Sequence, residues 1–155
     1  MQGLSTLQES KIAVSLRHIG LTVRNLERSR KFYQELFGFV EARRMDEKGA
    51  FLETVHGIPG IHVITSKLRA SLGGILLELL EYQYPESQEK DQRIFFIGCS
   101  HFSVTVPDAA AQYKRMVDAG VKTVSPPALS DDGRARVFIC KDPDGIVIEV
   151  VEEIR

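Results

Sequence analysis

The chain has 155 residues, of which 43% are hydrophobic and 26% are charged, and its formal net charge at pH 7 is −1. These values are ordinary for one globular domain, or for two small modules that share a core. A net charge so close to zero gives no electrostatic reason to expect a nucleic acid or an anionic membrane as a partner.

The cysteines and the N-terminal residues indicate the expected cellular compartment of the protein. Cys99 and Cys140 are too few for a disulfide framework and neither belongs to a CxxC pair, so we expect a reduced, cytoplasmic protein. Residues 1–11 lack the apolar run of a signal peptide, and no apolar stretch is long enough to span a membrane. We therefore interpret residues 1–15 as an N-terminal tail.

The first half of the chain begins with a predicted strand over residues 17–23, RHIGLTV, in which polar and apolar positions alternate. A helix is predicted next, because Asn25 is a good N-cap residue and Gly38 ends an apolar stripe of helical spacing. Three more strands are expected, at residues 39–45, 61–68 and 74–81.

Two segments interrupt this pattern. Residues 48–60 predict either a short helix and hinge that cover a cavity or an ordinary surface loop, and the sequence leaves both open. Residues 83–99 begin with a polar, charged stretch that contains Pro85, and we interpret them as a linker.

The second half repeats the first. SHFSVTV at residues 100–106 matches residues 17–23, and GIVIEVVE at residues 145–152 matches GILLELLE at residues 74–81. Asp108 is the expected cap of a second helix, 83 positions after the first cap, and that helix is predicted to end at Gly120, before strands at 121–124 and 135–140.

Each half therefore reads βαβββ. The sequence predicts an α+β fold in which two tandem βαβββ modules, residues 16–82 and 100–153, form a single domain over residues 16–153.

Alternation places one histidine and one glutamate of each half on the same kind of sheet face. Glu78 stands between apolar neighbours in its strand, and a buried carboxylate is rarely tolerated without a partner. A single histidine in a strand is more often structural than a ligand. Two histidines and two glutamates at repeated positions nevertheless predict a metal site formed by His18, Glu78, His101 and Glu149. Imidazole nitrogen and carboxylate oxygen suit zinc, nickel, cobalt, manganese or iron.

Other charged residues receive weaker predictions. Glu81 and Glu152 fall on the opposite strand face, where we expect them to be solvated. His62 could act as an acid or base if it faces the cavity, although such a residue is more often structural. Three basic residues could receive a substrate carboxylate or a CoA phosphate, although basic residues near strand ends are usually only solvated: Arg43, Arg44 and Lys67.

Several of these segments, above all DPDGIVIE at residues 142–149, resemble the vicinal oxygen chelate superfamily, also called the glyoxalase/bleomycin resistance/dioxygenase superfamily. The resemblance covers residues 16–153. It implies two βαβββ modules that form a curved sheet around a metal, with ligands from the first and last strand of each module. Those positions hold His18, Glu78, His101 and Glu149.

The resemblance also implies chemistry in which two substrate oxygens chelate the metal and an enolate is stabilised. The ligand set looks like that of glyoxalase I, in which a ligand glutamate shuttles the proton. We therefore expect a metal-dependent isomerase or lyase of the glyoxalase or epimerase type, with Glu149 as the favoured base and a small molecule with adjacent oxygens as substrate.

The residues expected around the substrate differ from those of glyoxalase I and of the epimerase. Small bacterial glyoxalase I proteins carry an arginine on the first strand where this chain has Thr22, and the epimerase has a second acid on the strand that here spans residues 61–66 and contains none. A metal-free binding protein of the bleomycin resistance type would not need four intact ligands. An extradiol-type dioxygenase would need an open metal position that Glu78 would occupy.

The linker is long enough for one chain to supply all four ligands, whereas a shorter one would favour exchange of modules between two chains. We expect the single-chain arrangement. We also expect a homodimer, because such sheets leave edges and apolar faces to cover.

Overall fold

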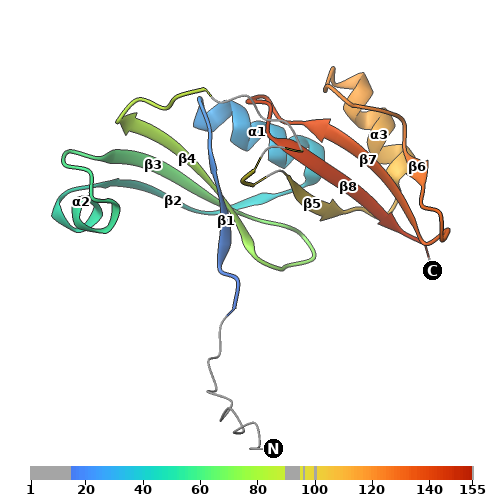
Figure 1. Ribbon diagram of the computed structural model, residues 1–155, viewed down its shortest axis with the longest axis horizontal. Coiled ribbons are helices and arrows are strands. Elements are labelled where there is room, and N and C mark those ends of the chain that lie inside the picture. Colours follow the sequence, from blue (N-terminus) through green and yellow to red (C-terminus); the bar gives the residue numbers. More distant parts are fainter. Residues whose placement is uncertain (1–14, 90–94, 96, 100, 155) are drawn as a thin grey trace, which may run out of the picture.

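The computed structural model describes residues 15–89, 95, 97–99 and 101–154. Its elements follow the predicted order, and a short helix follows the second strand of the first module (Figure 1). The elements are β1(His18–Thr22), α1(Leu26–Phe37), β2(Val40–Lys48), α2(Ala50–His56), β3(His62–Arg69), β4(Leu76–Tyr84), β5(Phe102–Thr105), α3(Ala109–Asp118), β6(Ala128–Leu129), β7(Ala135–Lys141) and β8(Val147–Glu153).

The strands form two four-stranded sheets with matching topology, β1-β4-β3-β2 and β5-β8-β7-β6. In each sheet the first strand of the module runs parallel to the last, and the remaining pairs are antiparallel. The sequence repeat is preserved in the register, because Gly20 pairs with Glu78 and Ser103 pairs with Glu149. The predicted α+β fold with two tandem βαβββ modules is confirmed.

Both helix starts are capped as predicted. The side chain of Asn25 accepts a hydrogen bond from the backbone N–H of Arg28 at 2.8 Å, and that of Asp108 accepts one from Ala111 at 2.9 Å. Gly38 ends α1 in the left-handed conformation, with φ of 70°, which a glycine adopts without steric cost.

One predicted strand is wrong. Residues 121–124 contribute only an isolated bridge, between Thr123 and Cys140, and the edge strand of the second sheet is β6 instead. Pro126 and Pro127 stand between the two segments, and because proline has no backbone N–H to donate, a continuous strand cannot form there.

The segment at residues 48–60 contains the short helix α2, as one of its two interpretations predicted, whereas its role as a hinge that covers a cavity stays a prediction. Leu52 of α2 is buried in a small apolar cluster with Ile61 and Val63, against which Leu80 and Tyr82 also pack. The helix is therefore fixed on the first sheet.

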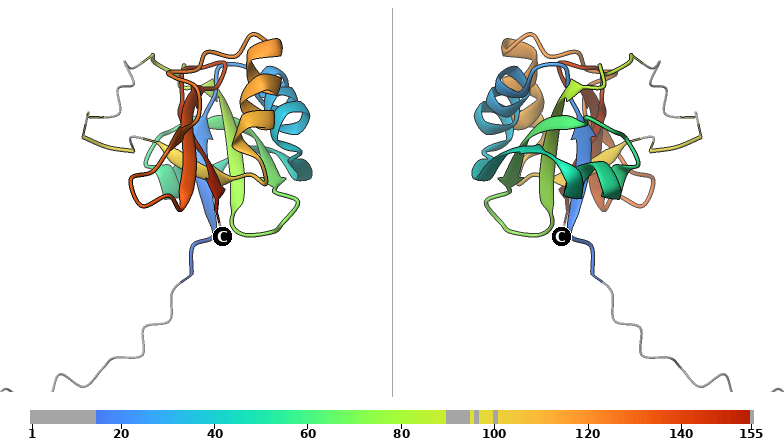
Figure 2. Two further views of the ribbon diagram at one scale, coloured as in Figure 1. Left: turned by 90° about the vertical axis from the view of Figure 1, so that its right-hand side faces the viewer. Right: turned by 90° about the vertical axis from the view of Figure 1, so that its left-hand side faces the viewer.

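The two modules share one core. α1 and α3 lie side by side on the same side of the two sheets (Figure 2), and the amide of Gln112 in α3 donates to the backbone carbonyl of Leu36 in α1 at 2.7 Å. Fully buried Tyr33 joins the modules, since its hydroxyl donates to Asp142 at 2.9 Å and its ring centroid lies 6.3 Å from that of Phe102. We call the opposite side of each sheet, which α1 and α3 do not cover, its open face.

None of the helices that the structure describes is both long enough and apolar enough to cross a membrane.

Candidate metal centre

The open face of the first sheet carries the first predicted pair of ligands. Glu78 of β4 stands between Gly20 of β1 and Lys67 of β3 in the hydrogen-bonded register. Because residues directly opposite each other in a ladder point to the same face, Lys67 and Glu78 share the open face. Strand alternation places His18 there too, whereas the neighbouring Leu77 and Leu79 enter the core beneath α1.

The Glu78 carboxylate is nearly buried, and each of its oxygens has a different partner. Its Oε2 lies 3.0 Å from Nε2 of His18, and its Oε1 lies 3.2 Å from Nζ of Lys67. The residue is 7% exposed, so these contacts offset the cost of removing the charge from water. The expectation that a glutamate in this apolar strand has a partner is confirmed.

The contact between His18 and Glu78 fits a shared metal ion. Bonds of about 2.0 to 2.2 Å to a divalent ion place neighbouring ligand atoms about 3 Å apart or slightly more. The observed separation of 3.0 Å between Nε2 and Oε2 meets this requirement. An imidazole nitrogen and a carboxylate oxygen are also the donors that zinc, nickel, cobalt, manganese and iron accept. This pair is half of the predicted ligand set.

The second pair lies on the other sheet. His101 immediately precedes β5 and is exposed, and Glu149 of β8 is half-buried. The Glu149 carboxylate makes no hydrogen bond or ion pair with any residue that the structure describes. Its environment therefore differs from that of Glu78, which is held at both oxygens.

A single chain does not assemble all four ligands in this arrangement. Within the described part of the chain, no three His, Cys, Asp or Glu side chains lie close enough together to hold a metal ion. The helices pack side by side, and the two sheets leave Thr22 and Thr105 exposed on their open faces. The single-chain expectation is therefore not met, because the described residues of one chain do not bring the candidate ligands of the two modules together.

The repeat breaks at one position beside the site. Lys67 is opposite Glu78 in the first sheet, whereas Ile139 is opposite Glu149 in the second. A positive charge directly opposite the candidate ligand glutamate is therefore present in the first module and is replaced by an apolar side chain in the second.

Two residues expected to be solvated have structural roles instead. The Glu81 carboxylate accepts a hydrogen bond from the backbone N–H of Leu26 at 2.6 Å, and that of Glu152 accepts one from Ala109 at 3.0 Å. Each acceptor satisfies the first free N–H of a helix. Glu81 follows Glu78 by three residues, and Glu152 follows Glu149 by three. This repeated spacing is the sequence signal that could have predicted a shared structural role for Glu81 and Glu152.

His62 does not contribute to the site. Because strand positions alternate, His62 projects from the side opposite to that of Val63, away from the open face. On that other side its Nε2 lies 2.6 Å from Oδ1 of Asp46. A role for His62 as acid or base at the metal is excluded by this orientation.

The DPDG segment shapes the turn that leads into β8. The buried Asp142 accepts hydrogen bonds from the backbone N–H groups of Asp144 at 2.9 Å and Ile146 at 2.8 Å, as well as from Tyr33. Burial raises the pKa of the Asp142 carboxyl above its usual value. Gly145, with φ of 83°, allows the turn. The motif thus positions the strand that carries Glu149.

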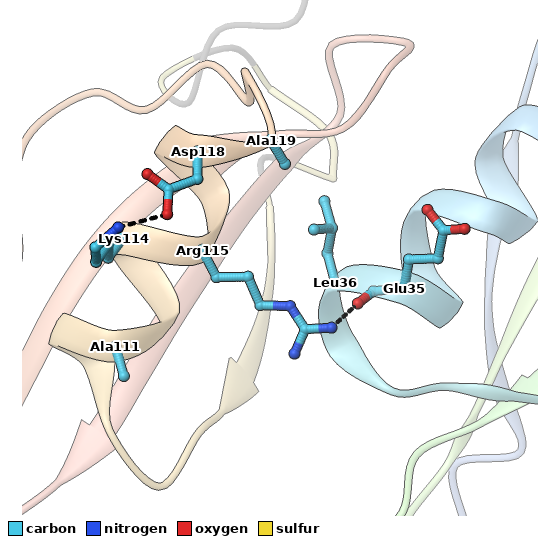
Figure 3. A pocket seen from close by; sticks show the side chains of 7 residues that line it. All are labelled: Glu35, Leu36, Ala111, Lys114, Arg115, Asp118 and Ala119. Carbon is cyan, nitrogen blue, oxygen red and sulfur yellow. Dashed lines mark hydrogen bonds and ion pairs between the residues drawn. The ribbon is translucent and has the colours of Figure 1, made fainter.

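Two pockets lie away from the four candidate ligands. One of about 580 Å³ opens between α1 and α3, where the guanidinium of Arg115 donates to the backbone carbonyl of Glu35 (Figure 3). It is on the helix side, opposite the open faces. The other, of about 1030 Å³, is lined by Thr22, Tyr82 and Asp144 among others, and so adjoins the end of the first open face.

Comparison with known proteins identifies a shared fold. The family model described as Glyoxalase/Bleomycin resistance protein/Dioxygenase superfamily matches residues 15–150. A glyoxalase family protein from Bacillus cereus has a TM-score of 0.85 at 17% identity, over 95% of this chain and 99% of that chain.

Two other similar structures have more specific names. The trypanothione-dependent glyoxalase I of Leishmania major has a TM-score of 0.63 at 22% identity, over 91% of this chain and 88% of its own. The fosfomycin resistance protein FosX of Listeria monocytogenes, solved with Mn(II) and a sulfate ion, has a TM-score of 0.64 at 15% identity, over 92% and 95%. No curated protein sequence is significantly similar to the chain.

Proposed function

Because the chain belongs to the Glyoxalase/Bleomycin resistance protein/Dioxygenase superfamily, we propose that it is a metal-dependent isomerase or lyase of the glyoxalase type. The ligands are His18, Glu78, His101 and Glu149. The observation that carries this proposal is the 3.0 Å contact between His18 and the buried Glu78 on an open sheet face, repeated in sequence by the second pair. Similarity to a glyoxalase I and to a protein solved with Mn(II) supports it.

The centre is completed between two copies of the chain. One chain presents two separate pairs of ligands on open faces. In a homodimer, the first open face of one copy can meet the second open face of the other, which brings the four ligands together. Phe51 and Val55, one turn apart on α2, are 80% and 62% exposed and add apolar surface for such contact.

The residues have distinct roles in the proposed reaction. When bound, a divalent ion supplies a Lewis acid for two adjacent oxygens of the substrate. Glu78, held by His18 and Lys67, is a fixed ligand. Glu149 has no partner among the described residues, and so its carboxylate is the one able to turn toward the substrate and accept a proton from carbon.

Metal analysis of the purified protein tests this proposal. We expect the wild type to retain a divalent ion. Glu78→Ala combined with Glu149→Ala should lower the affinity for that ion by at least about 10- to 100-fold, because losing even a residue that only hydrogen-bonds to a metal ligand has an effect of this size. The matched control is Glu35→Ala with Asp118→Ala, which removes two carboxylates on the helix side. Equal metal content in the wild type and in the ligand variant would refute the proposed centre.

A further inference from the structure

The open face of the first sheet carries two neighbouring positive charges. Arg43 of β2 is directly opposite Lys67 of β3 in the register, so both side chains project from the open face. Arg43 is exposed and makes no ion pair with any residue that the structure describes. The adjacent Arg44 points to the other side, where it pairs with Glu27 and Glu41.

Lys67 has one anionic partner, and that partner is a proposed metal ligand. Its Nζ lies 3.2 Å from Oε1 of Glu78, and its side chain is only 16% exposed. A lysine that is this well covered needs a compensating charge. Once Glu78 also binds a divalent ion, its single negative charge is shared between the ion and Lys67.

The charges around a loaded centre do not balance. Lys67, Arg43 and a divalent ion together carry four positive charges, against the two negative charges of Glu78 and Glu149. The next acid on the open face, Glu47, is held by the hydroxyl of Thr65 at 3.0 Å and lies four residues along β2 from Arg43, a distance of about 13 Å. The excess positive charge favours an anion beside Lys67.

We propose that Lys67 and Arg43 form a subsite for an acidic group of the substrate, separate from the two oxygens that chelate the metal. This inference rests on the proposed function and names the substrate class as a small acid with a carboxylate or phosphonate near its adjacent oxygens. The guanidinium of Arg43 matches the planar oxygens of such a group, and Lys67 adds a point charge. Because Ile139 replaces Lys67 in the second module, the acidic group binds toward the first module, which fixes the orientation of the substrate.

Binding of three probe acids to the metal-loaded protein tests the subsite. 2-Oxoglutarate and 3-phosphonopyruvate carry the same chelating 2-oxo acid group as 2-oxopentanoate, but only the first two have a second anionic group. Calorimetric titration should show that the wild type binds at least one of the two diacids about tenfold more tightly than 2-oxopentanoate. The tighter of the two diacids then distinguishes carboxylate from phosphonate.

Variants of Lys67 and Arg43 test whether these two residues cause the preference for a diacid over 2-oxopentanoate. Lys67→Met and Arg43→Met should each lower about tenfold the ratio of the affinity for the preferred diacid to that for 2-oxopentanoate. Arg43 contacts no proposed ligand among the described residues, so Arg43→Met should also leave the affinity for 2-oxopentanoate itself unchanged. Arg44→Met, on the helix side, is the matched control and should change neither. If Lys67→Met does not fold, Arg43→Met still tests the subsite, because Arg43 is exposed.

Three results would overturn the subsite, and they distinguish its failure from failure of the metal centre. If the wild type binds metal but binds all three acids equally, or if both variants keep the wild-type preference, the subsite is refuted and the metal centre stands. The protein is first titrated with the divalent ion alone, before any acid is added. If the wild type then binds no metal, the centre and the subsite fail together.

Discussion

The carboxylate of Glu81 holds the backbone N–H of Leu26, the first residue of α1, at 2.6 Å. The second module repeats this contact between Glu152 and Ala109 at the start of α3. In both modules the acceptor stands three residues after the proposed ligand glutamate and projects from the opposite side of the same strand. The strand that presents the proposed ligand glutamate on the open face thus also anchors the helix that covers the other face.

Loss of this anchor should destabilise the fold while leaving the proposed metal ligands in place. We expect Glu81→Ala to lower the free energy of unfolding by about 1 to 3 kcal/mol, because an N–H at the helix start loses its acceptor. Glu81→Gln keeps an oxygen acceptor and should cost less. Urea denaturation measures the effect, with the exposed Glu35→Ala as control. Equal midpoints for Glu81→Ala and the control would show that the contact contributes nothing.

The buried Asp142 should make stability fall as pH rises through its titration. Burial raises its pKa in the folded state above the unfolded value of 3.8, so the folded state holds the proton more tightly. The contribution of this group to stability is therefore complete below the unfolded pKa and is lost as pH rises through the folded pKa. Asp142→Asn removes the titration, and the difference in unfolding free energy between wild type and variant should change with pH over this interval. A difference that is constant from pH 3 upward would contradict this assignment.

The two cysteines should differ sharply in reactivity. Cys99 is exposed, whereas Cys140 is buried and its burial raises the pKa of its thiol to about 12. A thiol reagent at pH 8 should modify Cys99 in the folded protein and reach Cys140 only after unfolding. Mass spectrometry of peptides from the labelled protein checks this, and rapid native labelling of both thiols would show that the second module opens readily.

The proposed role of Glu149 as the base should be separable from its proposed role as a metal ligand. Glu149→Gln keeps an oxygen ligand and cannot accept a proton, so we expect exchange with deuterated solvent at the carbon beside the carbonyl of a bound 2-oxo acid to fall by about 100-fold or more. Glu78→Gln, which alters the carboxylate held by His18 and Lys67, is the comparison. A Glu149→Gln protein with full metal content and wild-type exchange would exclude this residue as the base.

The sequence predicts local structure well because caps and alternation act over a few residues. Asn25, Gly38 and Asp108 each have the predicted role, and Glu78 has the partner that its apolar strand requires. The exception is the edge strand of the second sheet, where two prolines displace the expected pairing.

The packing of the two modules against each other could not be predicted from such local sequence patterns. Periodicity places Glu78 and Glu149 on open faces but does not determine whether those faces meet, because this depends on how α1 and α3 pack. The contact from Tyr33 to Asp142, which joins residues far apart in the chain, helps to fix that packing and has no local signal. The position of Lys67 beside Glu78 also depends on how β3 and β4 pair. The sequence pattern of one strand does not contain this register.

The central claim is that one metal centre takes its ligands from two chains. A chain with His18→Ala and Glu78→Ala lacks the first pair, and a chain with His101→Ala and Glu149→Ala lacks the second, so neither should retain metal alone. In a heterodimer isolated with two different tags, one centre would consist of the intact first pair of one chain and the intact second pair of the other. Metal analysis of that heterodimer should find one divalent ion, and a heterodimer as free of metal as either parent would contradict a centre shared between chains.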